Sequence, residues 1–314
     1  MTMREDIVPD GRFARKPFRA TGRGVRTGDF NHNPSSWRSD RLIRALRSTD
    51  RMAPRTRPTE VQARMKLTVV GCSGSFPSEG SACSSYLVEA DGFRLLLDMG
   101  NGALGELQRH IGLYDLDAIL LSHLHPDHCI DMCGYFVARY YRHEGGRAGP
   151  LPVYGPEGTE QRLVTAYGDV PDERSMGEVF DFRTLVPGAF ALGPLTIRTD
   201  VVRHPVEAFA FRIEHDGRSL VYSGDTGPCE ALHKLALGTD LLLCEASFTY
   251  GKEDIPDLHL NGREAGEHAA RAGVGRLVLT HIPPWTDPLT NLRDARDVFD
   301  GPTELARTGA VYEI

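Results

Sequence analysis

This 314-residue chain lacks paired cysteines, long apolar runs and an apolar leader. None of its six cysteines forms a C-x-x-C pair, so we interpret them as mostly buried thiols in a reducing compartment. No apolar run approaches the roughly 20 residues that a membrane-spanning helix needs. The first residues have no apolar signal core. We therefore expect a soluble, cytoplasmic protein that does not bind membranes.

Positive charge is scarce outside the first 64 residues. The formal net charge is −7 overall, +8 for residues 1–64 and therefore −15 for residues 65–314. Proteins that track a long nucleic acid usually present a basic surface. The acidic body argues against that class of protein, and an apolar content of 40% supports a sizeable core.

Residues 1–64 are rich in Arg, Gly, Pro and Ser and show no sustained apolar period. One interpretation is a basic arm for RNA or an acidic partner. The other is a disordered extension, or a stretch ahead of a true start at Met65. We favour the second, because a folded segment must bury apolar area to offset its ordering entropy.

From Met65 onward the apolar pattern predicts interleaved strands and helices. The turn Asp91-Gly92 indicates a hairpin. Strands are predicted at 66–71, 85–90, 93–98, 117–121, 151–154, 195–202, 208–214, 219–223, 241–245 and 276–280. Helices are predicted at 103–111, 133–143, 159–167, 230–237, 261–272 and, closing the chain, 289–299.

A group of metal-binding side chains follows the apolar run 118–121: His123, His125, Asp127 and His128. Pro126 is expected to block helix formation and hold the segment as a loop. Alternate residues of an extended loop project to one side, so His123 and His125 can share one ion while Asp127 and His128 reach a second. Zinc and manganese take these nitrogen and oxygen ligands. The plain alternative is a polar loop with incidental histidines.

The pattern His-x-His-x-Asp-His after a strand resembles the metallo-β-lactamase superfamily of two-metal hydrolases. The resemblance implies an α/β (α+β) fold: an αββα sandwich of two mixed β-sheets flanked by helices, formed by a single hydrolase domain over residues 65–314. It also implies two divalent ions per chain, zinc or manganese, and no other cofactor. The two ions would share Asp225 as a bridging ligand. His123, His125 and His204 would complete the first site, and Asp127, His128 and His281 the second.

Residues 243–248 and 257–260 resemble the RNase Z branch of that superfamily. The resemblance implies that Glu245 orients and charges His259, which donates to the phosphate or to the leaving oxygen. The alternatives are a structural ion pair for Glu245 and a helix-flanking histidine for His259.

Two departures from RNase Z point to a small substrate. The family's long tRNA-binding arm is replaced by the four residues 215–218, and the loop 74–84 contains no Lys or Arg. The chain also resembles the atypical class II cyclic-nucleotide phosphodiesterases through residues 70–75, 223–227, 244–247 and 279–285. Ordinary class II enzymes have Leu where Pro126 stands.

The sequence therefore predicts a two-metal phosphodiesterase that converts 3′,5′-cyclic nucleotides, with cAMP as the expected substrate, to 5′-nucleotides. Asp127, His259 and Glu245 are the predicted catalytic residues. The alternatives are a tRNA 3′ endonuclease, a hydrolase of a lactone or ester, and a non-enzymatic binding protein. The expected partner is the cyclic nucleotide rather than tRNA, and relatives suggest a homodimer.

Overall fold

The computed structural model describes residues 65–142, 148–168, 175–251, 255 and 257–314. The predicted basic extension at 1–64 lies outside the described residues. None of the helices in the described ranges combines the length and hydrophobicity that a membrane span requires.

The first sheet has the strand order β15-β1-β3-β4-β5-β6-β7, and β2 pairs with β1. Its β3–β4 pairing is antiparallel, with Asp91 and Gly92 at positive φ in the turn, which confirms the predicted hairpin. From β4 to β7 the pairings are parallel. The strands are β1 (Lys66–Ser73), β2 (Ala82–Cys83), β3 (Ser85–Ala90), β4 (Phe93–Leu97), β5 (Ala118–Leu120), β6 (Leu151–Gly155), β7 (Phe180–Thr184) and β15 (Val311–Glu313).

The second sheet has the strand order β14-β13-β12-β11-β10-β9-β8. Its pairings are antiparallel from β8 to β11 and parallel from β11 to β14. Both sheets are therefore mixed. The strands are β8 (Gly188–Leu192), β9 (Leu195–Val201), β10 (Phe209–His215), β11 (Arg218–Tyr222), β12 (Leu241–Glu245), β13 (Leu277–Thr280) and β14 (Thr303–Leu305).

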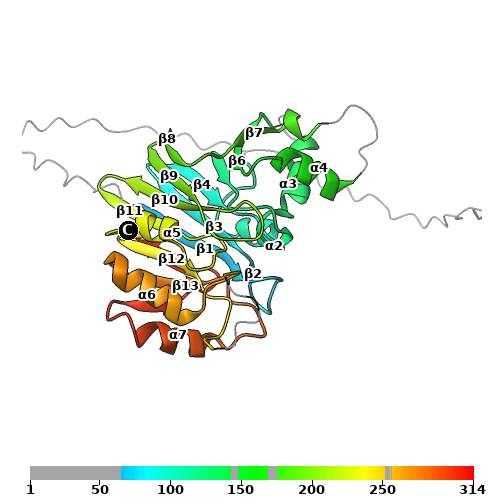
Figure 1. The fold of residues 1–314 in the computed structure, drawn as a ribbon. Coiled ribbons are helices and arrows are strands. Elements are labelled where there is room, and N and C mark those ends of the chain that lie inside the picture. Colours follow the sequence, from blue (N-terminus) through cyan, green and yellow to red (C-terminus); the bar gives the residue numbers. More distant parts are fainter. Residues whose placement is uncertain (1–64, 143–147, 169–174, 252–254, 256) are drawn as a thin grey trace, which may run out of the picture. The chain divides into compact units, whose positions relative to one another are not determined.

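Three apolar clusters hold the layers together. The central cluster joins the facing sides of the two sheets, with Tyr86 and Leu120 from the first and Phe211 and Leu243 from the second. A second cluster joins the first sheet to α1, α3 and α4, and a third joins the second sheet to α5, α6 and α7. The helices are α1 (Ala103–Leu107), α2 (Pro126–Cys129), α3 (Met132–Tyr140), α4 (Thr159–Tyr167), α5 (Glu230–Ala236), α6 (Gly262–Ala272) and α7 (Pro288–Arg296), with a 3-10 turn η1 at Met176–Glu178. The order of layers is αββα, as predicted (Figure 1).

The predictions made for Pro126 and for the last helix were wrong. Pro126 does not block a helix, because it is the first residue of α2 and places Asp127 and His128 on that helix. Proline is favoured at this position, where its missing N–H has no partner in the helix anyway and its φ suits helical geometry. The helix near the C-terminus does not close the chain either, because β14 and β15 follow it.

Candidate metal centre

The candidate ligands lie in loops and a helix that follow buried strands. His123 follows β5, Asp225 follows β11 and His281 follows β13. The strands β11, β12 and β13 run parallel, so their carboxyl ends meet at one edge of the second sheet. His204 lies in the loop between β9 and β10 rather than at a strand end. Side chains from both sheets thus meet at one place.

The first group could hold one ion. One ligand atom from each of His123, His125, His204 and Asp225 lies within 4.8 Å of all the others. His125 Nδ1 is 3.0 Å from His123 Nε2 and 3.2 Å from His204 Nε2. Three imidazole nitrogens that converge beside a carboxylate are a donor set that suits zinc.

The second group shares Asp225 with the first. It consists of Asp127, His128, Asp225 and His281, whose ligand atoms also lie within 4.8 Å of one another. Nε2 of His128 and Nε2 of His281 each lie 3.2 Å from a different oxygen of Asp225. Among the described residues, His128 Nε2 and Asp225 Oδ1 are buried without a hydrogen-bond partner. Buried polar atoms are rarely left unpaired, and a cation between them would satisfy both, so the residues present fit the metal.

The outer nitrogens of these histidines are fixed by neighbouring groups. His128 Nδ1 is 2.7 Å from Asp98 Oδ2, and His281 Nδ1 is 2.8 Å from Ser84 Oγ. His204 Nδ1 is 3.1 Å from the carbonyl oxygen of Leu258. Partners of this kind orient metal-binding imidazoles and select their tautomer.

Asp98 was missed by the sequence analysis, although the structure places it at the centre of the site's support. It is fully buried. Its carboxylate accepts hydrogen bonds from Ser122 N–H (2.6 Å), Ser122 Oγ (2.8 Å) and the hydroxyl of Tyr222 (2.7 Å), besides its contact with His128. The signal that could have found it is its place directly after β4, the same context that marks His281 after β13. Both residues have positive φ, at 57° and 53°, and such strained non-glycine residues concentrate at functional sites.

Burial and charge set the protonation of the site. Burial lowers the pKa of His123 well below its ordinary value and also lowers the pKa of His125 and His204. These imidazoles are therefore held neutral, the form that binds metal. Burial would raise the pKa of Asp225, but the histidines around it, His128 first among them, keep that pKa well below the usual range.

Glu245 and His259 form a pair beside the two groups. His259 Nδ1 lies 3.0 Å from Glu245 Oε1 and 3.9 Å from Asp225 Oδ2. The buried Glu245 carboxylate also accepts the backbone N–H groups of Thr226 (2.6 Å) and Ser247 (3.4 Å). Burial works against a charge on His259, yet the charge and hydrogen bond of Glu245, together with the charge of Asp225, outweigh it and raise the pKa of His259 to about 9. His259 is therefore held as a cation near neutral pH and can donate a proton.

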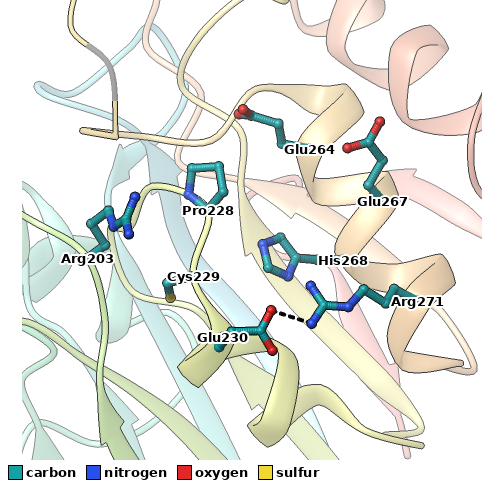
Figure 2. Close-up of a pocket in the computed structure, with 8 residues that line it drawn as sticks. All are labelled: Arg203, Pro228, Cys229, Glu230, Glu264, Glu267, His268 and Arg271. Atoms are coloured by element: carbon teal, nitrogen blue, oxygen red, sulfur yellow. Dashed lines mark hydrogen bonds and ion pairs between the residues drawn. The ribbon is translucent and has the colours of Figure 1, made fainter.

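A separate pocket opens between α5 and α6 (Figure 2). It has a volume of about 470 Å³. Its lining includes Arg203, Glu230, His268 and Arg271 but none of the candidate metal ligands. Glu230 and Arg271 pair with each other, as do Arg203 and Asp257. Burial lowers the pKa of His268 to about 4, so this histidine is neutral. The candidate metal ligands and the Glu245–His259 pair thus lie outside this pocket.

All the predicted site residues are brought together by the fold. The seven candidate ligands form the two groups, and Glu245 and His259 make a third with Asp225. Their roles in metal binding and catalysis stay predictions.

The comparisons with known proteins agree with this fold. The family model described as "Beta-lactamase superfamily domain" matches residues 93–282. The uncharacterized protein ML1173 of Mycobacterium leprae is 46% identical over 256 residues, which are 80% of this chain and 89% of that protein. The probable metallo-hydrolase YhfI of Bacillus subtilis is 32% identical over 251 residues, 79% of this chain and all of that protein. Its crystal structure matches with a TM-score of 0.73 at 30% identity, covering 80% of this chain and 100% of that one.

A third relative connects the chain to one branch of the superfamily. Ribonuclease Z of Mycolicibacterium gilvum is 33% identical over 246 residues, which are 71% of this chain and 86% of that protein. The chain therefore belongs to the metallo-β-lactamase superfamily of metallo-hydrolases, in its ribonuclease Z-like branch.

Proposed function

We propose that the protein is a two-metal phosphodiesterase that hydrolyses 3′,5′-cyclic nucleotides, with cAMP as the expected substrate, to 5′-nucleotides. The observation that carries this proposal is the Glu245–His259 pair. His259 of this pair lies 3.9 Å from Asp225. The pair is not needed to complete either candidate metal site, because the seven candidate ligands form both four-residue groups. A protonated histidine beside a metal centre is suited to phosphoryl transfer, in which charge builds up on the phosphoryl and leaving oxygens.

The chain's own residues divide the work. When bound, two divalent ions would activate water and withdraw charge from the phosphoryl oxygens. The carboxylate of Asp127 would take the proton of the attacking water, and the backbone N–H of Ser75 holds its Oδ2 at 2.9 Å. His259 would donate to a phosphoryl oxygen or to the 3′ leaving oxygen. Glu245 fixes the ring by its contact with Nδ1.

The residues that would hold the ions favour zinc. Five histidines contribute to the two groups, and zinc binds imidazole nitrogen and carboxylate oxygen readily. Manganese prefers oxygen-rich sites. We therefore propose zinc as the native metal and manganese as an alternative that the same residues accept.

A small substrate is supported by the turn between β10 and β11. His215 and Arg218 pair directly across this turn, and Asp216 and Gly217 between them have positive φ, as in a two-residue hairpin turn. The strands are joined with no room for an inserted arm. The acidic body of residues 65–314 also disfavours a long polyanion.

The rival with a specific observation in its favour is a tRNA 3′ endonuclease, because ribonuclease Z of Mycolicibacterium gilvum is 33% identical. A turnover panel with the purified, zinc-loaded chain separates these functions. The substrates are cAMP, cGMP, bis-p-nitrophenyl phosphate, precursor tRNA and a lactone. We expect cAMP to be turned over most efficiently and precursor tRNA to stay intact. Cleavage of precursor tRNA or of the lactone without hydrolysis of either cyclic nucleotide would contradict the proposal.

A further inference from the structure

Two large aromatic side chains lie together in solvent next to the metal centre. The rings of Phe76 and Trp285 have centroids 5.0 Å apart and planes inclined by 45°. Their exposed fractions are 42% and 69%. They come from loops that are far apart in the sequence, one after β1 and the other after β13.

Both loops are attached to the candidate ligands of the second ion. In the first loop, the residue before Phe76 is Ser75, whose N–H donates to Asp127 Oδ2. In the second loop, Trp285 is four residues beyond His281. The N–H of Gly74 donates to the carbonyl of Ile282 at 3.3 Å and joins the two loops. The aromatic pair is therefore at the rim of the metal centre.

The loop that carries Trp285 is held from both ends. Ser247 Oγ donates to the carbonyl of His281 at 2.8 Å. The buried Thr286 donates from its Oγ1 to the carbonyl of Ser247 at 3.0 Å and from its N–H to the carbonyl of Pro283 at 2.9 Å. Two prolines, Pro283 and Pro284, further restrict the backbone. The indole is thus presented on a pre-organised loop, which lowers the entropy lost when a ligand binds.

Leaving an indole in water forfeits the stabilisation that its burial would bring. The loop that carries Phe76 has no basic side chain that could bind a phosphate chain, since residues 74–84 contain no Lys or Arg. A flat, uncharged aromatic group is the ligand that such a surface would recognise. Aromatic side chains bind nucleobases in this way, by stacking on their π faces.

We propose that Phe76 and Trp285 form a platform that stacks on the base of the nucleotide substrate while its phosphate lies at the metal centre. The proposal rests on the proposed function and identifies what holds the base. The platform recognises a π face rather than a hydrogen-bonding edge, so the preference for adenine over guanine must come from other groups.

The test measures binding of the product rather than turnover. Isothermal titration of the zinc-loaded full chain uses two ligands, AMP and ribose 5-phosphate, which lacks the base. The variants are Trp285→Ala, Trp285→Phe and Phe76→Ala. The control is Tyr141→Ala, which removes the exposed ring of another aromatic pair, Tyr140–Tyr141, whose centroids are also 5.0 Å apart.

We expect Trp285→Ala to weaken AMP binding by about 5- to 150-fold, the range of base stacking on one aromatic side chain. Phe76→Ala should act in the same direction, and Trp285→Phe should restore most of the affinity. The affinity for ribose 5-phosphate and the metal content should not change in these variants. Tyr141→Ala should bind AMP as tightly as the wild type. The KM for cAMP should rise in Trp285→Ala while kcat changes little.

Two results would overturn the platform. The first is unchanged AMP binding in Trp285→Ala, and a change of oligomeric state in that variant would then make the pair a subunit contact. The second is an equal loss of affinity for AMP and for ribose 5-phosphate. A wild-type chain that binds AMP through Trp285 but leaves cAMP intact would contradict the proposed function alone.

Discussion

At the scale of single residues, His259 and Glu245 make the contact on which the proposed chemistry depends. The two side chains are 3.0 Å apart. Their pairing was predictable only through the resemblance to RNase Z, because they are fourteen positions apart in the sequence and this spacing does not imply a contact. The structure adds what the sequence did not contain: Glu245 is fully buried and receives two backbone N–H groups besides the histidine. A carboxylate fixed in this way keeps His259 charged and oriented.

Replacing His259 by Ala should lower kcat for cAMP by roughly 10²- to 10⁴-fold, the usual value of a positioned proton donor. KM should change less, because the interaction is made mainly in the transition state. Glu245→Gln should have a smaller effect, and the double variant should fall short of the product of the two if they act as one unit. His110→Ala, which removes a histidine that contacts Glu106, is the control. Steady-state kinetics with metal measured on the same samples decides this, and near-normal kcat for His259→Ala at full metal occupancy would refute the assignment.

Asp98 shows what sequence reasoning misses at this scale. The ligand motif drew attention to residues after β5, β11 and β13, but nothing in the spacing of Asp98 connects it to His128, thirty positions away. Only the parallel pairing of β4 and β5 brings the ends of these two strands together. A support residue has no motif of its own, because any element that reaches the ligand from outside can supply it.

Asp98→Asn should weaken metal binding by about 10- to 100-fold, the usual cost of losing an outer-shell partner. The substitution keeps the size of the side chain but replaces the carboxylate that faces His128 Nδ1. Asp181→Asn, at an exposed ion pair with Arg183, serves as the control. Competition for zinc with a chelator gives the affinities. Equal zinc affinity in Asp98→Asn and wild type would show that the contact does not support the site.

At the scale of helices and strands, prediction succeeded in sheet interiors and failed at sheet edges. The central strands β3 and β12 match their predicted ranges, because each contains a buried apolar run, Tyr86–Val88 in β3 and Leu241–Cys244 in β12. The four strands at the sheet edges, β7, β8, β14 and β15, were not predicted. They are three to five residues long and partly exposed, so they lack the apolar signal and depend on pairing with a neighbour. The helix predicted at 103–111 was too long, since α1 ends at Leu107.

The contact between α6 and α7 provides a test at this scale. A Cβ on Gly262 would lie 2.1 Å from the carbonyl oxygen of Asn291, whereas one on Gly105 in α1 would meet nothing within 4 Å. Alanine favours helix over glycine at both positions. We expect Gly262→Ala to lower the free energy of unfolding by about 1–3 kcal/mol through overpacking, and Gly105→Ala to raise it by about 0.5–1 kcal/mol. Urea unfolding measures both, and a Gly262→Ala protein as stable as wild type would contradict the packing argument.

At the scale of the whole molecule, the two sheets share one pattern of pairing. Each has antiparallel pairings along one part and parallel pairings along the other. The sequence has no internal repeat, so the two sheets resemble each other in their strand pairing and not in their residues. The sandwich was predicted through family resemblance, since periodicity alone gives strands and helices without their order in a sheet. The cytoplasmic location and the homodimer stay predictions.

The boundary at Met65 gives a prediction for the whole chain. Met65 is fully buried, and its carbonyl accepts the N–H of Ile314 at 2.9 Å, so the first described residue already packs in the fold. A protein that starts at Met65 should therefore keep its melting temperature and its turnover of cAMP. Differential scanning calorimetry and steady-state kinetics on both lengths test this. A large loss of either property would show that residues 1–64 belong to the working enzyme.

The central claim is that two ions held by these residues drive phosphodiester cleavage. Its most direct test is a titration of metal-free protein with Zn²⁺, in which hydrolysis of cAMP and bound zinc are measured on the same samples. Turnover should be absent without metal and reach its plateau near two ions per chain. Asp225→Ala, which removes the residue common to both groups, should bind less zinc and show no turnover. Full activity with one ion or none, or a chain loaded with two ions that leaves cAMP intact, would contradict the account.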